Sequence, residues 1–193
     1  GFYLNGRFVK CKKVKDILLY YKPNKFLECF AGSGTGFDVA RELGYTNSVH
    51  LDLNDRFGNF NLLTDRLPTG FDLVFSHPPY WNIIKYSGKN NVWGDKTYKD
   101  DLSHIEDYEE YINKLNIINK KIYDIIVPGG RHVILIGDVR KKGKYFSIIK
   151  DMVWYGEIEA HLIKVQHNTK SQNKKYANNN FIPIAHEHVL VFR

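Results

Sequence analysis

Two segments of this chain each carry a hydrophobic strand into a distinctive turn. Residues 26–36 read Phe-Leu-Glu-Cys-Phe-Ala-Gly-Ser-Gly-Thr-Gly, and residues 71–81 read Phe-Asp-Leu-Val-Phe-Ser-His-Pro-Pro-Tyr-Trp. Glycines after a strand let the backbone turn sharply and aim helix amides at a ligand, whereas consecutive prolines hold a turn rigid. The two segments therefore predict a ligand site at the ends of two strands.

The rest of the chain alternates strand patterns with helix patterns. Residues 35–43 form a short helical pattern, and residues 107–126 repeat apolar side chains at helical spacing until Pro128-Gly129-Gly130. This alternation predicts an α/β fold with a mostly parallel sheet, and the polar connection between the last two strands predicts an antiparallel hairpin at one edge. The expected strands are residues 25–30, 48–53, 71–76, 131–137, 158–166 and 189–193.

Composition narrows the class of protein. A chain of 193 residues with 43% hydrophobic residues is long enough for one domain, and no apolar run reaches the roughly 18 residues of a membrane span. Two cysteines are too few for a disulfide framework, which favours a cytoplasmic location. The net charge of +7 suits a polyanionic partner, with a basic solvated surface as the alternative.

The glycine loop favours a nucleotide-like ligand over a nucleoside triphosphate, because no Gly-Lys-Ser/Thr follows it. Glu28 near the strand end could receive a cationic amine. Asp52 follows the second strand, where doubly wound folds place the acid that binds ribose hydroxyls. S-adenosylmethionine carries both groups. The alternative is a glycine-rich turn that serves only close packing.

Phe-Ala-Gly-Ser-Gly-Thr followed by a Pro-Pro-Tyr turn resembles the DNA adenine-N6 and cytosine-N4 methyltransferases. Residues 102–111, 127–137 and 186–193 resemble later helices and strands of that family, so the resemblance covers nearly the whole chain. It implies a Rossmann-like seven-stranded methyltransferase sheet in a single domain, residues 1–193, without a separate target-recognition domain. It also implies S-adenosyl-L-methionine as cofactor and methylation of an exocyclic amino group of a base flipped from duplex DNA.

The resemblance assigns roles to residues at both motifs. The family uses the residue before Pro-Pro and a backbone carbonyl as hydrogen-bond acceptors for the amine, which points to His77 and the carbonyl of Pro78. Tyr80 would stack on the base and Trp81 would wall the pocket. The catalytic set is His77, Pro78, Pro79 and Tyr80, and the cofactor set is Glu28, Phe30, Ala31, Gly32, Ser33, Gly34, Asp52, Asn61 and Ser76.

His77 departs from the family pattern, which usually has Asp, Asn or Ser at this position. A neutral imidazole has one acceptor nitrogen, but an imidazolium has none. The sequence therefore predicts that activity falls as the pH drops through the titration of this histidine. A rate unchanged from pH 8 to about pH 5.5 would contradict the direct role of His77.

Several interpretations stay open. The enzyme could act on an RNA base, or the chain could be a catalytically silent nucleic-acid-binding subunit. Target recognition would fall to residues 82–103 and to the polar stretch 167–180. Arg140 and Lys142 would bind phosphate; the alternative is that they lie in a solvated turn. A homodimer, a specificity subunit and a restriction partner are further possibilities. His186-Glu187-His188 offers too few ligands for a metal, so no metal site is expected.

Overall fold

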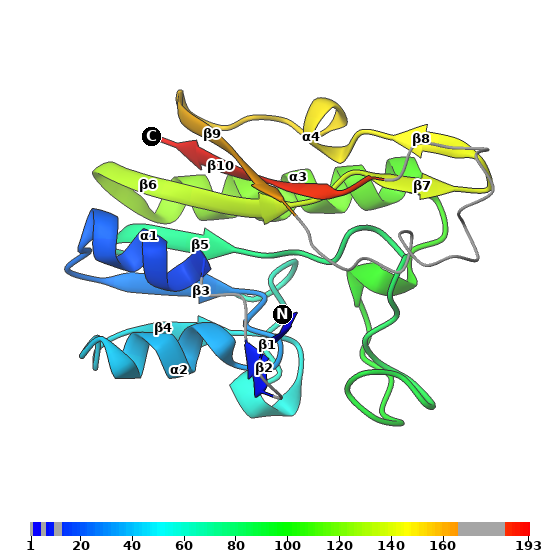
Figure 1. Cartoon of the computed structure of the whole chain (residues 1–193), viewed down its shortest axis with the longest axis horizontal. Coiled ribbons are helices and arrows are strands. Elements are labelled where there is room, and N and C mark those ends of the chain that lie inside the picture. Colours follow the sequence, from blue (N-terminus) through cyan, green and yellow to red (C-terminus); the bar gives the residue numbers. More distant parts are fainter. Residues whose placement is uncertain (1, 5–6, 10–12, 166–183) are drawn as a thin grey trace.

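We describe a computed structural model of the chain, in which residues 2–4, 7–9, 13–165 and 184–193 are defined (Figure 1). Its centre is a six-stranded sheet with the order β4-β3-β5-β6-β10-β9. The strands of this sheet are β3 (Phe26–Cys29), β4 (Val49–Leu51), β5 (Phe71–Ser76), β6 (Ile126–Ile136), β9 (Ile158–Val165) and β10 (His186–Phe192). The helices are α1 (Lys13–Tyr21), α2 (Thr35–Glu42), α3 (Tyr108–Ile125) and α4 (Ile148–Asp151).

The predicted α/β class is confirmed. Strands β4, β3, β5 and β6 run parallel, and β10 pairs antiparallel with both β6 and β9. The expected antiparallel edge hairpin is therefore present. The strand count differs, since the sheet has six strands rather than seven.

The segment around Asn61, between β4 and β5, is a tight turn. The 3-10 helix η1 (Asp55–Phe57) precedes it, and the amides of Thr64 and Asp65 both donate to the carbonyl of Asn61 at 3.1 and 2.8 Å. A backbone closed on itself in this way has no free amides for a sheet ladder.

Helices cover both faces of the sheet, as Figure 1 shows. Alternate residues of one strand reach opposite layers. Phe26 packs with the buried residues of α1 and α2, whereas Leu27 packs with the buried residues of α3. The predicted apolar stripe of residues 107–126 is confirmed, because it supplies Tyr111, Ile112, Leu115, Ile118 and Ile122 to the core.

Three smaller elements complete the described fold. Strands β1 (Phe2–Leu4) and β2 (Arg7–Val9) form one antiparallel pair, and β7 (Val139–Lys141) and β8 (Lys144–Phe146) form another. The 3-10 helix η2 (Leu102–His104) leads into α3, where the Asp107 side chain accepts from the amide of Glu110 at 2.7 Å. In the described part of the chain, no helix is long and apolar enough to cross a membrane. Residues 167–180 lie outside the described residues.

Candidate active site

The two sequence motifs meet at one edge of the sheet. Strands β3 and β5 are parallel neighbours, with Cys29 opposite Ser76. Because both strands end at this level, the glycine loop after β3 and the His-Pro-Pro-Tyr turn after β5 emerge side by side. Ligand sites of open α/β sheets lie at this carboxyl end.

Positive φ angles and close packing explain the glycines of the loop. Gly32 and Gly34 have φ angles of 55° and 84°, and Phe30 also lies in the left-handed region at 61°. At Gly36, glycine is required by close packing and not by the φ angle. A Cβ at this position would lie 2.0 Å from Oε1 of Glu28, so only glycine lets α2 approach β3 this closely.

Asp52 braces the glycine loop from β4. Its Oδ2 accepts from the amide of Gly32 at 2.7 Å, and its Oδ1 accepts from the backbone amide of Asn54 at 3.0 Å. Burial raises the pKa of Asp52, and the hydrogen bonds from Asn54 and Gly32 oppose that rise. The side chain of Asn54 also donates to the carbonyl of Gly32 at 3.0 Å. Sequence reasoning missed Asn54, although Asx side chains after a strand commonly shape turns.

Glu28 has a protein partner instead of an open face. The side chain is 4% exposed, and its Oε2 lies 2.7 Å from Nδ1 of His50. Burial raises the pKa of Glu28, while His50 opposes that effect. In the described structure, Glu28 therefore pairs with His50 and lies beneath Gly36, and its contact with a cofactor amine stays a prediction.

Arg56 lies across the glycine loop, which no sequence pattern indicated. Its guanidinium donates to the carbonyl of Ser33 and packs against the ring of Phe57, with 5.1 Å between Cζ and the ring centroid. The neighbouring Asp55 forms an ion pair with Lys96 at 2.6 Å. These contacts tie the loop that follows β4 to both the glycine loop and the segment 82–103.

The backbone carbonyls of Pro78 and Pro79 differ in their hydrogen bonding. The Pro79 carbonyl accepts from the Tyr111 hydroxyl at 2.7 Å and from the amide of Trp81 at 3.0 Å. Among the described residues, no hydrogen bond reaches the carbonyl of Pro78. The resemblance assigns the Pro78 carbonyl to the substrate amine, and this carbonyl accepts no hydrogen bond from the described residues.

His77 and Tyr80 are joined to the last two strands. Nε2 of His77 lies 2.9 Å from the Tyr80 hydroxyl, which donates to Oε1 of Glu187 at 2.8 Å. Lys164 pairs with the other oxygen of Glu187. Burial raises the pKa of Glu187, but the hydrogen bonds from Lys164 and Tyr80 outweigh burial and leave that pKa below its ordinary value.

The side chain of His77 is exposed, and its ring packs against that of Tyr80, with 5.6 Å between the ring centroids. Partial loss of hydration lowers the pKa of His77 to about 4. Glu187 opposes this shift and Lys164 adds to it. The neutral imidazole is therefore the form present at neutral pH.

Trp81 is part of the core and does not wall a pocket. Its φ of 53° turns the side chain inward, where it is 5% exposed and its Nε1 donates to the carbonyl of Ile105 at 2.9 Å. The ring packs edge-on against Tyr108 and Phe146, with centroids 5.2 and 5.0 Å away. The sequence-based role of Trp81 is corrected accordingly.

Two residues assigned to the cofactor have other partners. Ser76 is fully buried, and its hydroxyl lies 2.8 Å from Nε2 of His132. Asn61 donates to Asp100 at 3.0 Å and accepts from the amide of Leu63 at 3.0 Å. Ser76 is therefore corrected to a core residue, whereas Asn61 joins its turn to the segment 82–103.

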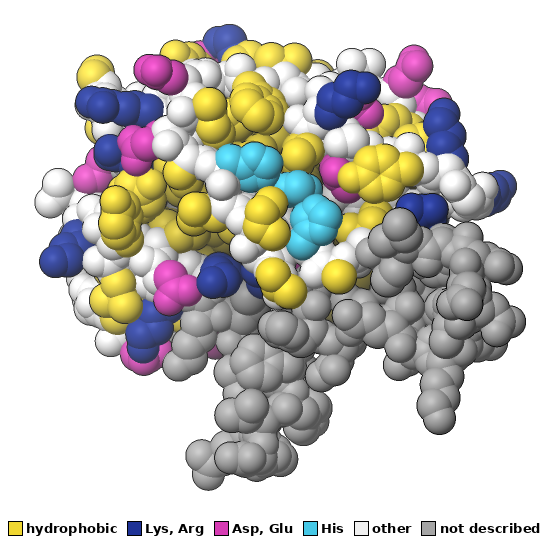
Figure 2. Space-filling view, turned by 45° about the horizontal axis from the view of Figure 1, so that its top comes forward, with side chains coloured by type: hydrophobic (Ala, Val, Ile, Leu, Met, Phe, Trp, Pro, Cys, Tyr) yellow, Lys and Arg dark blue, Asp and Glu magenta, His cyan; other side chains and the backbone are white. Residues whose placement is uncertain are grey.

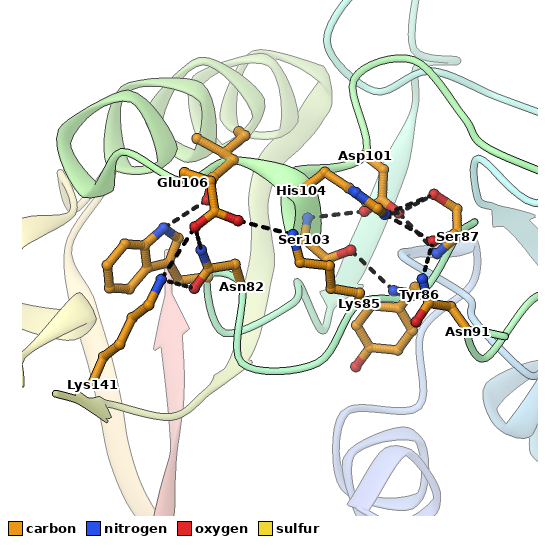
Figure 3. Close-up of polar contacts among 12 residues, drawn as sticks. Asn82, Lys85, Tyr86, Ser87, Asn91, Asp101, Ser103, His104, Glu106 and Lys141 are labelled. Carbon is orange, nitrogen blue, oxygen red and sulfur yellow. Dashed lines mark hydrogen bonds and ion pairs between the residues drawn. The ribbon is translucent and has the colours of Figure 1, made fainter. Parts of the chain in front are cut away.

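The segment 82–103 is ordered by a buried polar cluster, which we call the Ser87–Asp101 cluster (Figure 3). Oδ2 of Asp101 accepts from the Ser87 hydroxyl at 2.7 Å and from the Ser87 amide at 3.2 Å, and Oδ1 accepts from the Ser103 amide at 2.9 Å. His104 lies 2.8 Å from the Ser87 carbonyl. The expected functional loop is thus a fixed element of the site.

Tyr86 brings a phenol from this segment to the site. Burial and the carboxylates of Asp101, Asp52 and Glu187 raise its pKa. Asp101 lies in the segment 82–103, Asp52 follows β4 and Glu187 belongs to β10, so carboxylates from three parts of the fold act on the Tyr86 phenol. The sequence had shown Tyr86 only as an aromatic interruption of a polar segment.

Replacing Asp101 with alanine is expected to destabilise the protein by about 3 kcal/mol, because the Ser87 hydroxyl and two backbone amides lose a buried acceptor. Hydrogen exchange should show lost protection concentrated in residues 82–103. Asp95→Ala is the matched control, since Asp95 lies in the same segment, is exposed and accepts only from the amide of Asn90 in the described structure. Equal losses in the two variants would contradict a structural role for the Ser87–Asp101 cluster.

The basic residues after β6 lie on a hairpin. Arg140 belongs to β7, and Lys142 occupies the turn with a φ of 49°. Both are exposed. Asp138 anchors the hairpin from its base, because its carboxylate accepts from the Tyr145 hydroxyl at 2.5 Å and the Ser147 hydroxyl at 3.0 Å.

Histidines gather on one face of the molecule, beside hydrophobic side chains (Figure 2). The ring of His188 lies 5.1 Å from that of His161 and 4.8 Å from that of His186. Within the described residues, no group of three or more His, Cys, Asp or Glu side chains could hold a metal ion. No metal is assigned to this face.

The fold of this chain is similar to that of solved structures that include an N-methyltransferase. NodS, an N-methyltransferase from Bradyrhizobium japonicum whose structure contains S-adenosyl-L-homocysteine, is 11% identical over 94% of this chain and 86% of its own, with a TM-score of 0.55. TehB from Haemophilus influenzae is 13% identical over 98% of this chain and 64% of its own, with a TM-score of 0.56. These identities establish the fold alone.

A third solved structure comes from a protein of Thermus thermophilus that carries the provisional name DNA modification methylase. It is 25% identical over 63% of this chain, with a TM-score of 0.39. This chain spans 43% of the length of that protein. No protein-family model and no curated protein matches the chain.

Proposed function

We propose that this protein transfers a methyl group from S-adenosyl-L-methionine to an exocyclic amino group of a base in DNA, adenine N6 or cytosine N4. One observation carries the proposal. The parallel pairing of β3 and β5, with Cys29 opposite Ser76, brings a glycine loop with left-handed backbone beside the His-Pro-Pro-Tyr turn. A cofactor loop and an amine-binding turn must lie this close for direct transfer.

The residues around the glycine loop fit the cofactor. No side chain caps the N-terminus of α2 at Gly34, so the first amides of this helix are available to a ligand. A Cβ at Gly32 would meet no atom closer than 3.9 Å, which indicates open space beside the loop. When bound, S-adenosyl-L-methionine supplies an electrophilic methyl group on its sulfonium. Asp52 and the backbone of residues 30–34 would hold it.

The catalytic turn prepares the amine. The lone pair of an exocyclic amine is delocalised into the base, which makes the nitrogen a weak nucleophile. Hydrogen bonds from its two protons to His77 and the Pro78 carbonyl would draw the nitrogen toward tetrahedral geometry. Pro78 and Pro79 keep this backbone from relaxing. Tyr80 and Tyr86 supply aromatic surface for the base.

The net charge of +7 and the exposed Arg140 and Lys142 after β6 suit a nucleic acid. The Pro-Pro-Tyr resemblance favours DNA over RNA. A homodimer or a specificity subunit would extend the contact with a duplex, and light scattering of the purified protein tests for the homodimer.

The proposal is tested in two stages. Expression in methylation-free cells, followed by modification-sensitive sequencing, should show N6-methyladenine or N4-methylcytosine in a fixed sequence context. The purified protein should then transfer tritiated methyl groups to DNA and not to RNA. Transfer to RNA alone would identify an RNA enzyme, and failure to bind the cofactor in calorimetry would leave a silent nucleic-acid-binding subunit.

The pH profile of methyl transfer should reflect the lowered pKa of His77. The neutral imidazole is the competent form, and its folded-state pKa of about 4 lies below the ordinary value. Activity is therefore present above this pKa and is lost as the pH falls through it. We expect kcat to stay level from pH 8 to about pH 5.5 and to decline below, which revises the expectation from the sequence. A decline centred near the ordinary histidine pKa would contradict the lowered pKa.

A further inference from the structure

The hydroxyl of Tyr80 lies in a niche built by three strands. Gly137 follows β6, and a Cβ at this position would lie 2.8 Å from Cε2 of Tyr80, so glycine leaves the space for the ring. Glu187 of β10 is 6% exposed and accepts from the hydroxyl at 2.8 Å. Strand register places Lys164 of β9 opposite Glu187, with which it pairs.

The hydrogen bonds among Glu187, Tyr80 and His77 indicate which of their atoms carry protons. An ionised carboxylate can only accept, so the single proton of the Tyr80 hydroxyl is committed to Glu187. The Tyr80 oxygen can then serve His77 only as an acceptor. The 2.9 Å contact between Nε2 of His77 and this oxygen therefore requires a proton on Nε2. In a neutral ring, Nδ1 is then left with a lone pair.

We propose that Glu187 is a positioning residue that sets the tautomer of His77 through Tyr80, so that Nδ1 is the acceptor presented to the substrate amine. Among the described residues, no hydrogen bond reaches this Nδ1. The tautomer stands independently of the reaction, and its use toward an amine rests on the proposed function.

Lys164 has a narrower role in this arrangement. It keeps Glu187 ionised, since its ion pair offsets the burial of the carboxylate. Its ammonium group bonds to Oε2 of Glu187, whereas the Tyr80 hydroxyl bonds to Oε1. Removing Lys164 would raise the pKa of Glu187, so Lys164→Met acts on the same relay and is not a control. His161→Ala, at an exposed position of the same strand, is the control.

Nitrogen-15 spectra of histidine-labelled protein at neutral pH test the proposal directly, with His77→Asn identifying the His77 signals. We expect the wild type and the control His161→Ala to show a protonated Nε2 and an unprotonated Nδ1 on His77. Glu187→Leu frees the Tyr80 proton to point at His77, so a substantial population should move to the Nδ1-protonated form. Tyr80→Phe removes the relay with a smaller change and should also give a mixture of tautomers.

Kinetics provide the second measurement. Glu187→Leu should lower kcat about 10-fold with cofactor affinity unchanged, while His161→Ala stays within about twofold. A wild-type Nδ1-protonated ring, or an unchanged tautomer in both Glu187→Leu and Tyr80→Phe, would overturn the proposal. If the wild type methylates no nucleic acid, the proposed function fails, whereas the spectra still decide the tautomer.

Discussion

Replacing Gly36 with alanine is expected to destabilise the fold by about 3 kcal/mol and to weaken cofactor binding about 10-fold or more. The new Cβ would lie 2.0 Å from Oε1 of Glu28, a carboxylate that is 4% exposed. Glu28 cannot swing away freely, because His50 holds its other oxygen at 2.7 Å. Denaturant unfolding and calorimetric titration with S-adenosyl-L-methionine measure the two effects.

Two further variants separate this collision from a general effect on α2. Thr35→Ala changes the same helical turn without adding an atom near Glu28, and should cost less than about 0.5 kcal/mol. In a Glu28→Ala background, Gly36→Ala should cost less than about 1 kcal/mol, since the colliding carboxylate is gone. Additive losses in the double variant would refute the collision as the cause.

His77→Ala is expected to lower kcat about 100-fold while cofactor affinity stays unchanged. The variant removes one of the two acceptors for the amine, and the side-chain hydrogen bond of His77 goes to Tyr80 rather than to the glycine loop. Single-turnover methyl transfer measures the chemical step, and calorimetry measures cofactor binding.

His77→Asn is the matched variant, because the amide oxygen of the new asparagine can still accept a hydrogen bond. It should retain activity to within about 10-fold of the wild type. His161→Ala removes an exposed histidine of β9 and should leave the rate within about twofold. A His77→Ala enzyme with the wild-type kcat would exclude a direct role for the imidazole.

The pattern of apolar residues predicted the main elements well. The helical stripe of residues 107–126 and the strands that carry the two motifs agree with α3, β3 and β5. These elements follow from local spacing, which side-chain direction translates into buried faces. The seventh strand was implied only by the family resemblance and not by an apolar run of this chain, and the described sheet has six strands.

The candidate site was harder to predict. The sequence placed Trp81 at the pocket and Ser76 at the cofactor, whereas both lie in the core with Ile105 and His132 as partners. Neither partner is near in the sequence. Asn54, Arg56 and Tyr86 were missed for the same reason, since each acts through contacts that the tertiary fold creates.

The sequence alone determined the turn chemistry of this protein. Glycine permits the left-handed backbone found at Gly32 and Gly34, and proline makes the Pro78-Pro79 turn rigid; both are properties of the residues themselves. The tertiary structure alone decided which atoms these turns present. Insertion of β10 between β6 and β9 brings Glu187 to the Tyr80 hydroxyl across 107 residues of sequence, and this contact fixes the proton on His77. A hydrogen bond between such distant residues depends on strand order and register, which no local pattern encodes.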